Sequence, residues 1–256
     1  MEIALLTLGI AAGILAGLFG IGGGIVMVPV LVAFFGMELL DANAISLTAM
    51  LLPVGVMGVI TYYKAGLINV KHSLIIAIGL LCGSFVGGEI AVNINESLLA
   101  KLYAAYLLYA ATTYLLAKTP KTATRNDNEI SYSDKEFPVW AFIALGLVAG
   151  VTAGMFGKGG GLIIVPLLVS IFKYNPKAAT ATSLAALQLP VGLPSVIIYA
   201  EKGHGNLLFA AIVAAGIVGG TFLGSKFALK LPAKLFKRIY AVFLCAVGVY
   251  MVVKYI

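Results

Sequence analysis

The chain has little charge. Only 11% of its 256 residues are Asp, Glu, Lys or Arg, whereas 61% are hydrophobic. A soluble globular domain is typically about 25% charged and about 45–50% apolar. So few charges cannot cover the water-facing surface of a chain this long, which excludes a soluble cytosolic enzyme. The net charge of +7 therefore indicates the basic cytoplasmic loops of a membrane protein and not a nucleic-acid-binding surface.

Cysteine and histidine are also scarce, with two of each. Cys82 and Cys245 both lie inside apolar runs, which indicates neither a disulfide framework nor a metal cluster. His72 and His204 are expected at loop ends and give no plausible base for a hydrolytic triad. The motifs GxxxxGK[ST], GxGxxG and GxSxG are absent from the sequence. We therefore expect no enzyme activity, no cofactor and no bound metal.

Glycine, in contrast, is abundant and falls in a repeated pattern. Gly17–Pro29 reads GLFGIGGGIVMVP, and Gly154–Pro166, 137 positions further on, reads GMFGKGGGLIIVP. The same offset relates Ser46 to Ser183, and it persists without a gap. We infer an internal duplication. Its parts are an N-terminal transmembrane repeat at 1–117, a polar cytoplasmic linker at 118–137 and a C-terminal transmembrane repeat at 138–256.

Each half contains three apolar runs of about 20 residues, the length of a membrane-crossing helix. These runs are Ile45–Tyr63, Ser73–Val92 and Leu98–Ala117, then Thr182–Ala200, Leu207–Leu229 and Leu235–Tyr255. Each half also opens with a longer run, Ile3–Phe35 or Val139–Phe172, that a glycine cluster interrupts. Glycine costs about 1 kcal/mol in a helix interior. The clusters therefore predict a broken helix, which is one unwound span, two half-helices folded into a hairpin, or two short full spans.

The distribution of basic residues favours the hairpin. If each long run crosses the membrane once, the basic residues divide evenly between the two sides. If each run returns to its own side, Lys101, Lys202 and Lys254 lie on one side, and every other basic residue except Lys158 lies on the other. The positive-inside rule therefore predicts an all-α polytopic membrane protein with two inverted-topology repeats. Each repeat is a Gly-broken helical hairpin plus three transmembrane helices, although two short full spans would give the same sidedness.

Inverted repeats are a recurrent plan of secondary transporters, in which substrate binds near the midplane where helices are discontinuous. The glycine clusters at 20–24 and 157–161 are the expected discontinuities here. The helix that follows each cluster begins with free backbone N–H groups, which can hold an anion. The simpler alternative is that glycine only permits a tight turn and close helix packing.

Lys158 is the charged residue expected at membrane depth, and Ile21 stands at its position in the first repeat. A charge at that depth costs at least about 2.5–3.5 kcal/mol on insertion scales. No acid lies nearby in the sequence, so an anionic substrate is its expected partner. Snorkelling to an interface and pairing with Glu89 are the alternatives.

Polar side chains cluster near the start of the second span of each half: Asn43, Ser46 and Thr48, then Thr180, Thr182 and Ser183. Their hydroxyls can ligate an oxyanion or can equally cap a helix and bond its carbonyls. Pro53 and Pro190 should kink these spans, and Gln188 follows Ser183 by about one turn. The predicted substrate-binding residues are Gly22, Gly23, Gly24, Ser46, Lys158, Gly159, Gly160, Gly161, Thr182, Ser183 and Gln188.

The duplicated motif G-[LM]-F-G-x-G-G-G-[IL]-[VI]-x-V-P, followed by the repeated Ser-Leu and Leu-Pro-Val-Gly, resembles the TauE/SafE sulfite exporter family. This family is also called the 4-toluene sulfonate uptake permease family. The resemblance covers nearly the whole chain apart from the linker. It implies a bacterial or archaeal inner-membrane transporter of small sulfur-containing anions, such as sulfite, sulfoacetate and other organosulfonates. By residue it extends to both glycine clusters and to the regions around Ser46 and Ser183.

We therefore expect a secondary transporter that moves a sulfite or organosulfonate anion across the inner membrane by alternating access. An anion channel and a non-transporting membrane assembly or sensor protein are the alternatives. The expected partners are the small anion and the lipid bilayer. Nucleic acid is not expected, and a homodimer is a possible assembly.

Overall fold

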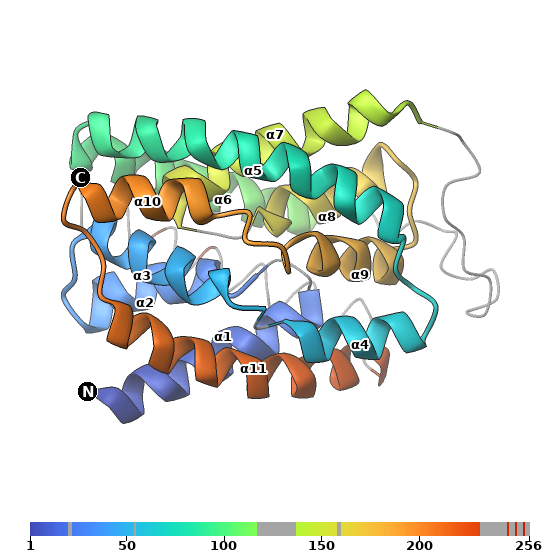
Figure 1. The fold of residues 1–256 in the computed structure, drawn as a ribbon, viewed down its shortest axis with the longest axis horizontal. Helices are drawn as coiled ribbons and strands as arrows, with labels where there is room; N and C mark the ends of the chain where they lie inside the picture. Colours follow the sequence, from blue (N-terminus) through green and yellow to red (C-terminus); the bar gives the residue numbers. More distant parts are fainter. Residues whose placement is uncertain are drawn as a thin grey trace. The chain divides into compact units, whose positions relative to one another are not determined.

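A computed structural model describes residues 1–19, 22–53, 55–116, 137–157 and 160–230, with Cys245, Val249 and Val253. These residues form helices and no strands, so the predicted all-α class is confirmed (Figure 1). In chain order the helices are α1 (Glu2–Phe19), α2 (Gly24–Phe34), α3 (Leu39–Leu51), α4 (Val56–Lys64), α5 (Val70–Asn93), α6 (Glu96–Leu116), α7 (Val139–Phe156), α8 (Gly161–Ser170), α9 (Pro176–Ala186), α10 (Leu193–Glu201) and α11 (Leu207–Lys230).

The chain divides into two compact units. One comprises Met1–Asn93 with Ile130–Ala228, and the other comprises Ile94–Glu129 with Leu229–Ile256. The second unit contains α6, which matches the predicted span Leu98–Ala117. Most of the predicted span Leu235–Tyr255 lies outside the described residues. The first unit holds the other described helices, α11 up to Ala228, and both glycine breaks.

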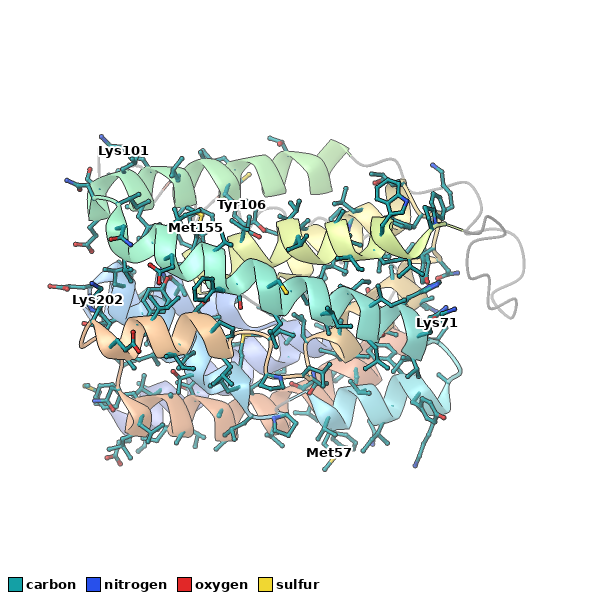
Figure 2. All side chains as sticks on the ribbon, turned by 45° about the horizontal axis from the view of Figure 1, so that its top comes forward. Met57, Lys71, Lys101, Tyr106, Met155 and Lys202 are labelled. Carbon is teal, nitrogen blue, oxygen red and sulfur yellow. The ribbon has the colours of Figure 1, made fainter. Side chains whose placement is uncertain are left out.

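Within the described residues, four helices are long and apolar enough to cross a membrane: α1, α5, α7 and the part of α11 at Leu207–Ala228. The bent pair of α3 and α4 makes a fifth candidate span. Their outer surfaces expose large apolar side chains, as a lipid environment permits. On α5, for example, Ile78 is 59% exposed and Phe85 is 52% exposed. Figure 2 shows Lys71 and Lys202 at opposite ends of the helices, with Met57 on the outer surface between them.

Both glycine clusters break the helix, as predicted. Helix α1 ends at Phe19 and α2 begins at Gly24; α7 ends at Phe156 and α8 begins at Gly161. The backbone at Gly22 (φ 71°) and at Gly157 and Gly160 (φ 66° and 64°) adopts a left-handed conformation that side chains disfavour. The two arms are unequal. Helix α1 has 18 residues and is a candidate span by itself, whereas α2 has 11 and turns back so that Gly23 lies against Ala12.

The second spans are broken and not merely kinked. Helix α3 ends at Leu51, and Leu52, which precedes Pro53, is extended with ψ 148°. A residue before proline is disfavoured in the helical region, and proline lacks the N–H that continues a helix. Helix α4 then starts at Val56 with a bend of 50° relative to α3. The second half breaks at the equivalent place, between Ala186 and Leu193.

Glycine also sets the packing between the halves. The backbone of α5 touches α7 so closely that Cβ atoms on Gly79, Gly83 and Gly87 would lie 2.1–2.4 Å from carbonyl oxygens of α7. Residue numbers rise together along the contact, so the two helices run parallel. Helices α1 and α11 make the equivalent contact through Gly9, Gly13 and Gly17 of α1, which face Val213, Ile217 and Thr221. Each half therefore packs its first long helix on the other half.

Candidate functional site

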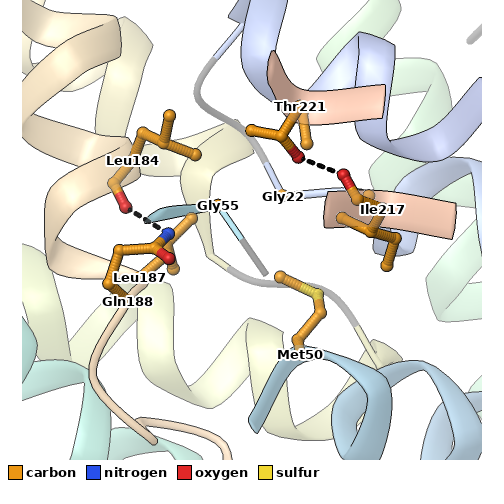
Figure 3. A pocket seen from close by; sticks show the side chains of 10 residues that line it. Gly22, Met50, Gly55, Leu184, Leu187, Gln188, Ile217 and Thr221 are labelled. Carbon is orange, nitrogen blue, oxygen red and sulfur yellow. Dashed lines mark hydrogen bonds between the residues drawn. The ribbon is translucent and has the colours of Figure 1, made fainter. Parts of the chain in front are cut away.

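A cavity of about 10 Å³ lies beside the first glycine break (Figure 3). Its walls come from both halves of the chain: Ala16, Gly22, Gly23, Met50 and Gly55 from the first, and Leu184, Leu187, Gln188, Ile217 and Thr221 from the second. A space of this size holds about one water molecule. Gly23 is the last residue before α2, so the cavity is adjacent to a helix N-terminus.

The break between α3 and α4 meets the end of α9 at this cavity. A Cβ atom on Gly55 would lie 2.4 Å from Gln188 Nε2 and 3.1 Å from Gln188 Oε1. The side-chain amide of Gln188 therefore rests on bare backbone at Gly55. Figure 3 shows the amide beside the Gly55 ribbon. A larger residue at position 55 would displace the amide.

Gln188 and Thr221 are the polar side chains among the residues that line the cavity. Gln188 Nε2 donates to Leu184 O at 3.0 Å, and Thr221 Oγ1 donates to Ile217 O at 2.6 Å. Both bonds stay within or next to the side chain's own helix, as Figure 3 shows. Gln188 Oε1 is buried and accepts no hydrogen bond from the described residues. Two acceptor atoms, Gln188 Oε1 and Thr221 Oγ1, therefore lie among the lining side chains next to the start of α2, and Gln188 Nε2 keeps a second N–H.

The second glycine break is held by side chains of α3. Ser46 Oγ donates to Gly157 O at 2.6 Å, and Asn43 Nδ2 donates to Met155 O at 3.0 Å. A Cβ atom on Gly157 would lie 2.5 Å from Asn43 Cα. The Ser46 hydroxyl therefore bonds a backbone carbonyl, but one of the other half and not one of its own helix. Gly160 precedes α8 and Gly161 begins it, whereas Lys158 and Gly159 lie outside the described residues.

The polar cluster of the second half is engaged in contacts with the chain around the start of α5. Thr182 Oγ1 accepts from Asn69 N at 3.3 Å, and Thr182 O accepts from Ser73 Oγ at 3.0 Å. Thr182 and Ser183 are both fully buried. These bonds join the two halves and engage the hydroxyl oxygen and the carbonyl of Thr182 within the protein.

The structure thus brings only part of the predicted site together. Gly22, Gly23 and Gln188 line the cavity, and Gly24 begins the helix directly after it. Ser46, Thr182, Ser183, Gly160 and Gly161 are not among the lining residues. Sequence reasoning missed Thr221, Gly55 and Met50. A signal for Gly55 was present, because it repeats as Gly192 at the same offset as the glycine motifs.

Both histidines join the two halves, which their loop positions did not indicate. His204 Nδ1 lies 3.1 Å from Asp41 Oδ1, and Gly205 N donates to the same oxygen at 3.1 Å. His72 bonds the hydroxyl of Tyr174 through Nδ1 and stacks on Phe142 with ring centroids 4.1 Å apart. These contacts join the N-terminal turns of α3 and α5 to the second half.

Replacing Ser46 with alanine is expected to destabilise the protein by about 1–3 kcal/mol, because the buried Gly157 carbonyl loses its donor. The measurement is thermal unfolding of the purified protein in detergent. Thr7→Ala is the matched control, since Thr7 Oγ1 bonds only Ala4 O on an exposed face of α1. That change should stay within about 0.5 kcal/mol. Equal melting temperatures for both variants would contradict the structural role of Ser46.

Comparison with known proteins gives one consistent result. The family profile described as "Sulfite exporter TauE/SafE" matches residues 5–251. A probable membrane transporter protein of Methanocaldococcus jannaschii is 30% identical over 96% of this chain and 94% of its own length. The probable membrane transporter protein YunE of Bacillus subtilis is 26% identical over 96% and 95%, and one of Haemophilus influenzae is 28% identical over 97% of both chains.

No solved structure matches the chain significantly. The assignment therefore rests on the sequence matches, which extend over both glycine motifs, and on the apolar helices that could span a membrane. The chain belongs to the TauE/SafE family of membrane transporters.

Proposed function

We propose that the protein is a secondary transporter that carries a small sulfur-containing anion, sulfite or an organosulfonate, across the cell inner membrane. It would work by alternating access and perform no chemical step on its substrate. The observation that carries this proposal is the cavity at the first glycine break, where Gly22 and Gly23 meet α9 and α11 of the other half. Discontinuous helices that meet at a cavity are the usual substrate site of secondary transporters.

The packing supports an inverted relation between the halves. Helix α5 runs parallel to α7, and α1 runs parallel to α11. In Figure 1, α1 starts at the marked N-terminus, and α7 starts at the opposite end of the view. Two equivalent helices that run in opposite directions are what a two-fold axis in the membrane plane produces.

The size of the cavity supports a carrier over an open channel. A volume of about 10 Å³ is too small for an anion with four or more heavy atoms, because one water already fills it. Substrate entry must therefore separate the halves, and we propose that they rock about the breaks at Gly55 and Gln188. A channel would need a continuous wet path instead.

In this proposal the anion is held by backbone N–H groups at the starts of α2 and α8 and by Lys158. Helix N-termini carry a partial positive charge that favours anions. Protons or the membrane potential would supply the driving force. Export as the direction of transport follows from the family resemblance.

Reconstitution into proteoliposomes tests the function. Vesicles loaded with unlabelled sulfite should accelerate uptake of labelled sulfite, because a carrier exchanges its substrate across the membrane. Saturable uptake with counterflow supports the carrier. Conductance without counterflow would indicate a channel. If neither sulfite nor an organosulfonate crosses the membrane, a transport function for these anions is contradicted.

A further inference from the structure

The donor and acceptor groups around the cavity indicate what kind of anion fits it. Thr221 already donates its hydroxyl proton to Ile217 O, and Gln188 Nε2 already donates to Leu184 O. The oxygen atoms of both side chains therefore remain as acceptors, and the second N–H of Gln188 Nε2 remains as a donor. The buried Gln188 Oε1 accepts nothing from the described residues. A ligand that receives hydrogen bonds from the start of α2 would meet acceptors on the opposite wall.

The orientation of the Gln188 amide is fixed by its surroundings. Oxygen and nitrogen of a side-chain amide can be exchanged in principle. Here the exchange would place Oε1 where Nε2 now lies, 3.0 Å from Leu184 O. Two acceptor atoms would then face each other at hydrogen-bonding distance and would repel. The bare backbone of Gly55 holds the amide from the other side. The bond to Leu184 therefore fixes which end of the amide is Oε1, and this atom is an acceptor whatever the second N–H of Nε2 contacts.

The side-chain amide of Gln188 has no counterpart in the first half. The repeat offset places Leu51 at the position equivalent to Gln188, and Gly192 at the position equivalent to Gly55. A Cβ atom on Gly192 would meet Leu47 Cδ2 at 3.1 Å instead of an amide. The duplication would permit a leucine at 188, so packing in the repeat does not by itself require the amide.

We propose that Gln188 Oε1 accepts a hydrogen bond from the transported anion, so that the site selects monoanions that carry their own hydrogen-bond donor. Hydrogensulfite and hydroxysulfonates belong to this class. Sulfite dianion and simple alkanesulfonates do not. This inference rests on the proposed function and names the substrate class of the same site.

The selection follows from electrostatics at short range. A donor on the substrate satisfies the buried Oε1, whereas a sulfonate without one leaves it unpaired and places a charged oxygen near it. Sites built to hydrogen-bond a substrate hydroxyl discriminate strongly against analogues that lack it. One such bond to a charged ligand corresponds to a factor of about ten in affinity.

The test uses competition for labelled sulfite uptake by the reconstituted full chain. Ethanesulfonate and 2-hydroxyethanesulfonate differ by one hydroxyl donor, and the hydroxylated compound should compete about tenfold better. At equal total sulfite, uptake should be faster at a pH where hydrogensulfite predominates than at a pH where the sulfite dianion predominates. Gln188→Leu should remove the preference for the hydroxylated competitor.

Two glycine variants distinguish the effect of the Gln188 amide from a general effect of packing. In Gly55→Ala the new Cβ displaces the Gln188 amide, and the preference should fall as in Gln188→Leu. In the equivalent Gly192→Ala it should persist. Unchanged preference in Gln188→Leu or Gly55→Ala would overturn this inference alone. Failure of the wild-type protein to take up any sulfur anion would overturn the proposed function, and this inference with it.

Discussion

Replacing Gly83 with alanine is expected to cause a large loss of stability. The new Cβ would lie 2.2 Å from Leu147 O, 2.9 Å from Val151 N and 3.0 Å from Gly150 Cα. All three are backbone atoms, so no side chain can rotate away and α5 must separate from α7. Overpacking of this kind costs about 3 kcal/mol at the upper end of the usual range. That corresponds to a melting temperature lower by roughly 6–12 °C.

Gly219→Ala is the matched control for this experiment. Gly219 is also a helical glycine, but a Cβ there would meet nothing within 4 Å. Alanine is the better helix former by about 1 kcal/mol, so this variant should melt at the same temperature or slightly higher. Thermal unfolding in detergent, followed by fluorescence or light scattering, compares the two. Equal stabilities would show that the α5–α7 contact is looser than the structure has it.

Replacing Lys158 with isoleucine is expected to abolish most anion transport. Isoleucine is the residue at the equivalent position of the first repeat, so the substitution should be compatible with folding. If Lys158 is the cation that binds the anion, its removal should lower uptake at subsaturating substrate by at least tenfold, since charged hydrogen bonds contribute about 1.5–3 kcal/mol. Lys158→Arg keeps the charge and should retain part of the activity.

Initial rates of labelled sulfite uptake in proteoliposomes measure this effect. The variant must first show a normal melting temperature, which separates loss of binding from loss of fold. Lys202→Ala serves as the control, because Lys202 is exposed at the end of α10. Wild-type uptake by a folded Lys158→Ile protein would remove this residue from the site.

Sequence reasoning found the local features of the fold well. The glycine breaks could be predicted because several glycines in a row raise the free energy of a helix wherever they occur. The break at Pro53 was underestimated as a kink, because the extended conformation of Leu52 adds to the missing proline N–H. The partners of the glycine faces could not be predicted, since Gly83 meets Leu147 and Gly13 meets Ile217 across the repeats.

The residues that line the cavity were predicted only in part for the same reason. Gln188 was recognised because it departs from Leu51 in the repeat. Ser46 had two equal roles in the sequence, and the Gly157 carbonyl, 111 positions away, favours the structural one. Thr221 carried no signal of its own, because its place on the cavity depends on how α11 packs against α1. Contacts between residues far apart in the chain decide such roles.

The packing of long helices of one half on those of the other has a consequence for biosynthesis. Helix α5 finds its glycine-matched neighbour only when α7 has been made, and α1 must wait for α11, which comes more than 180 residues later. A ribosome-bound chain that ends after α6 therefore contains α1 and α5 without α11 and α7, the helices that pack against their glycine faces. Packing of the first half is therefore completed only after α11 of the second half has been made.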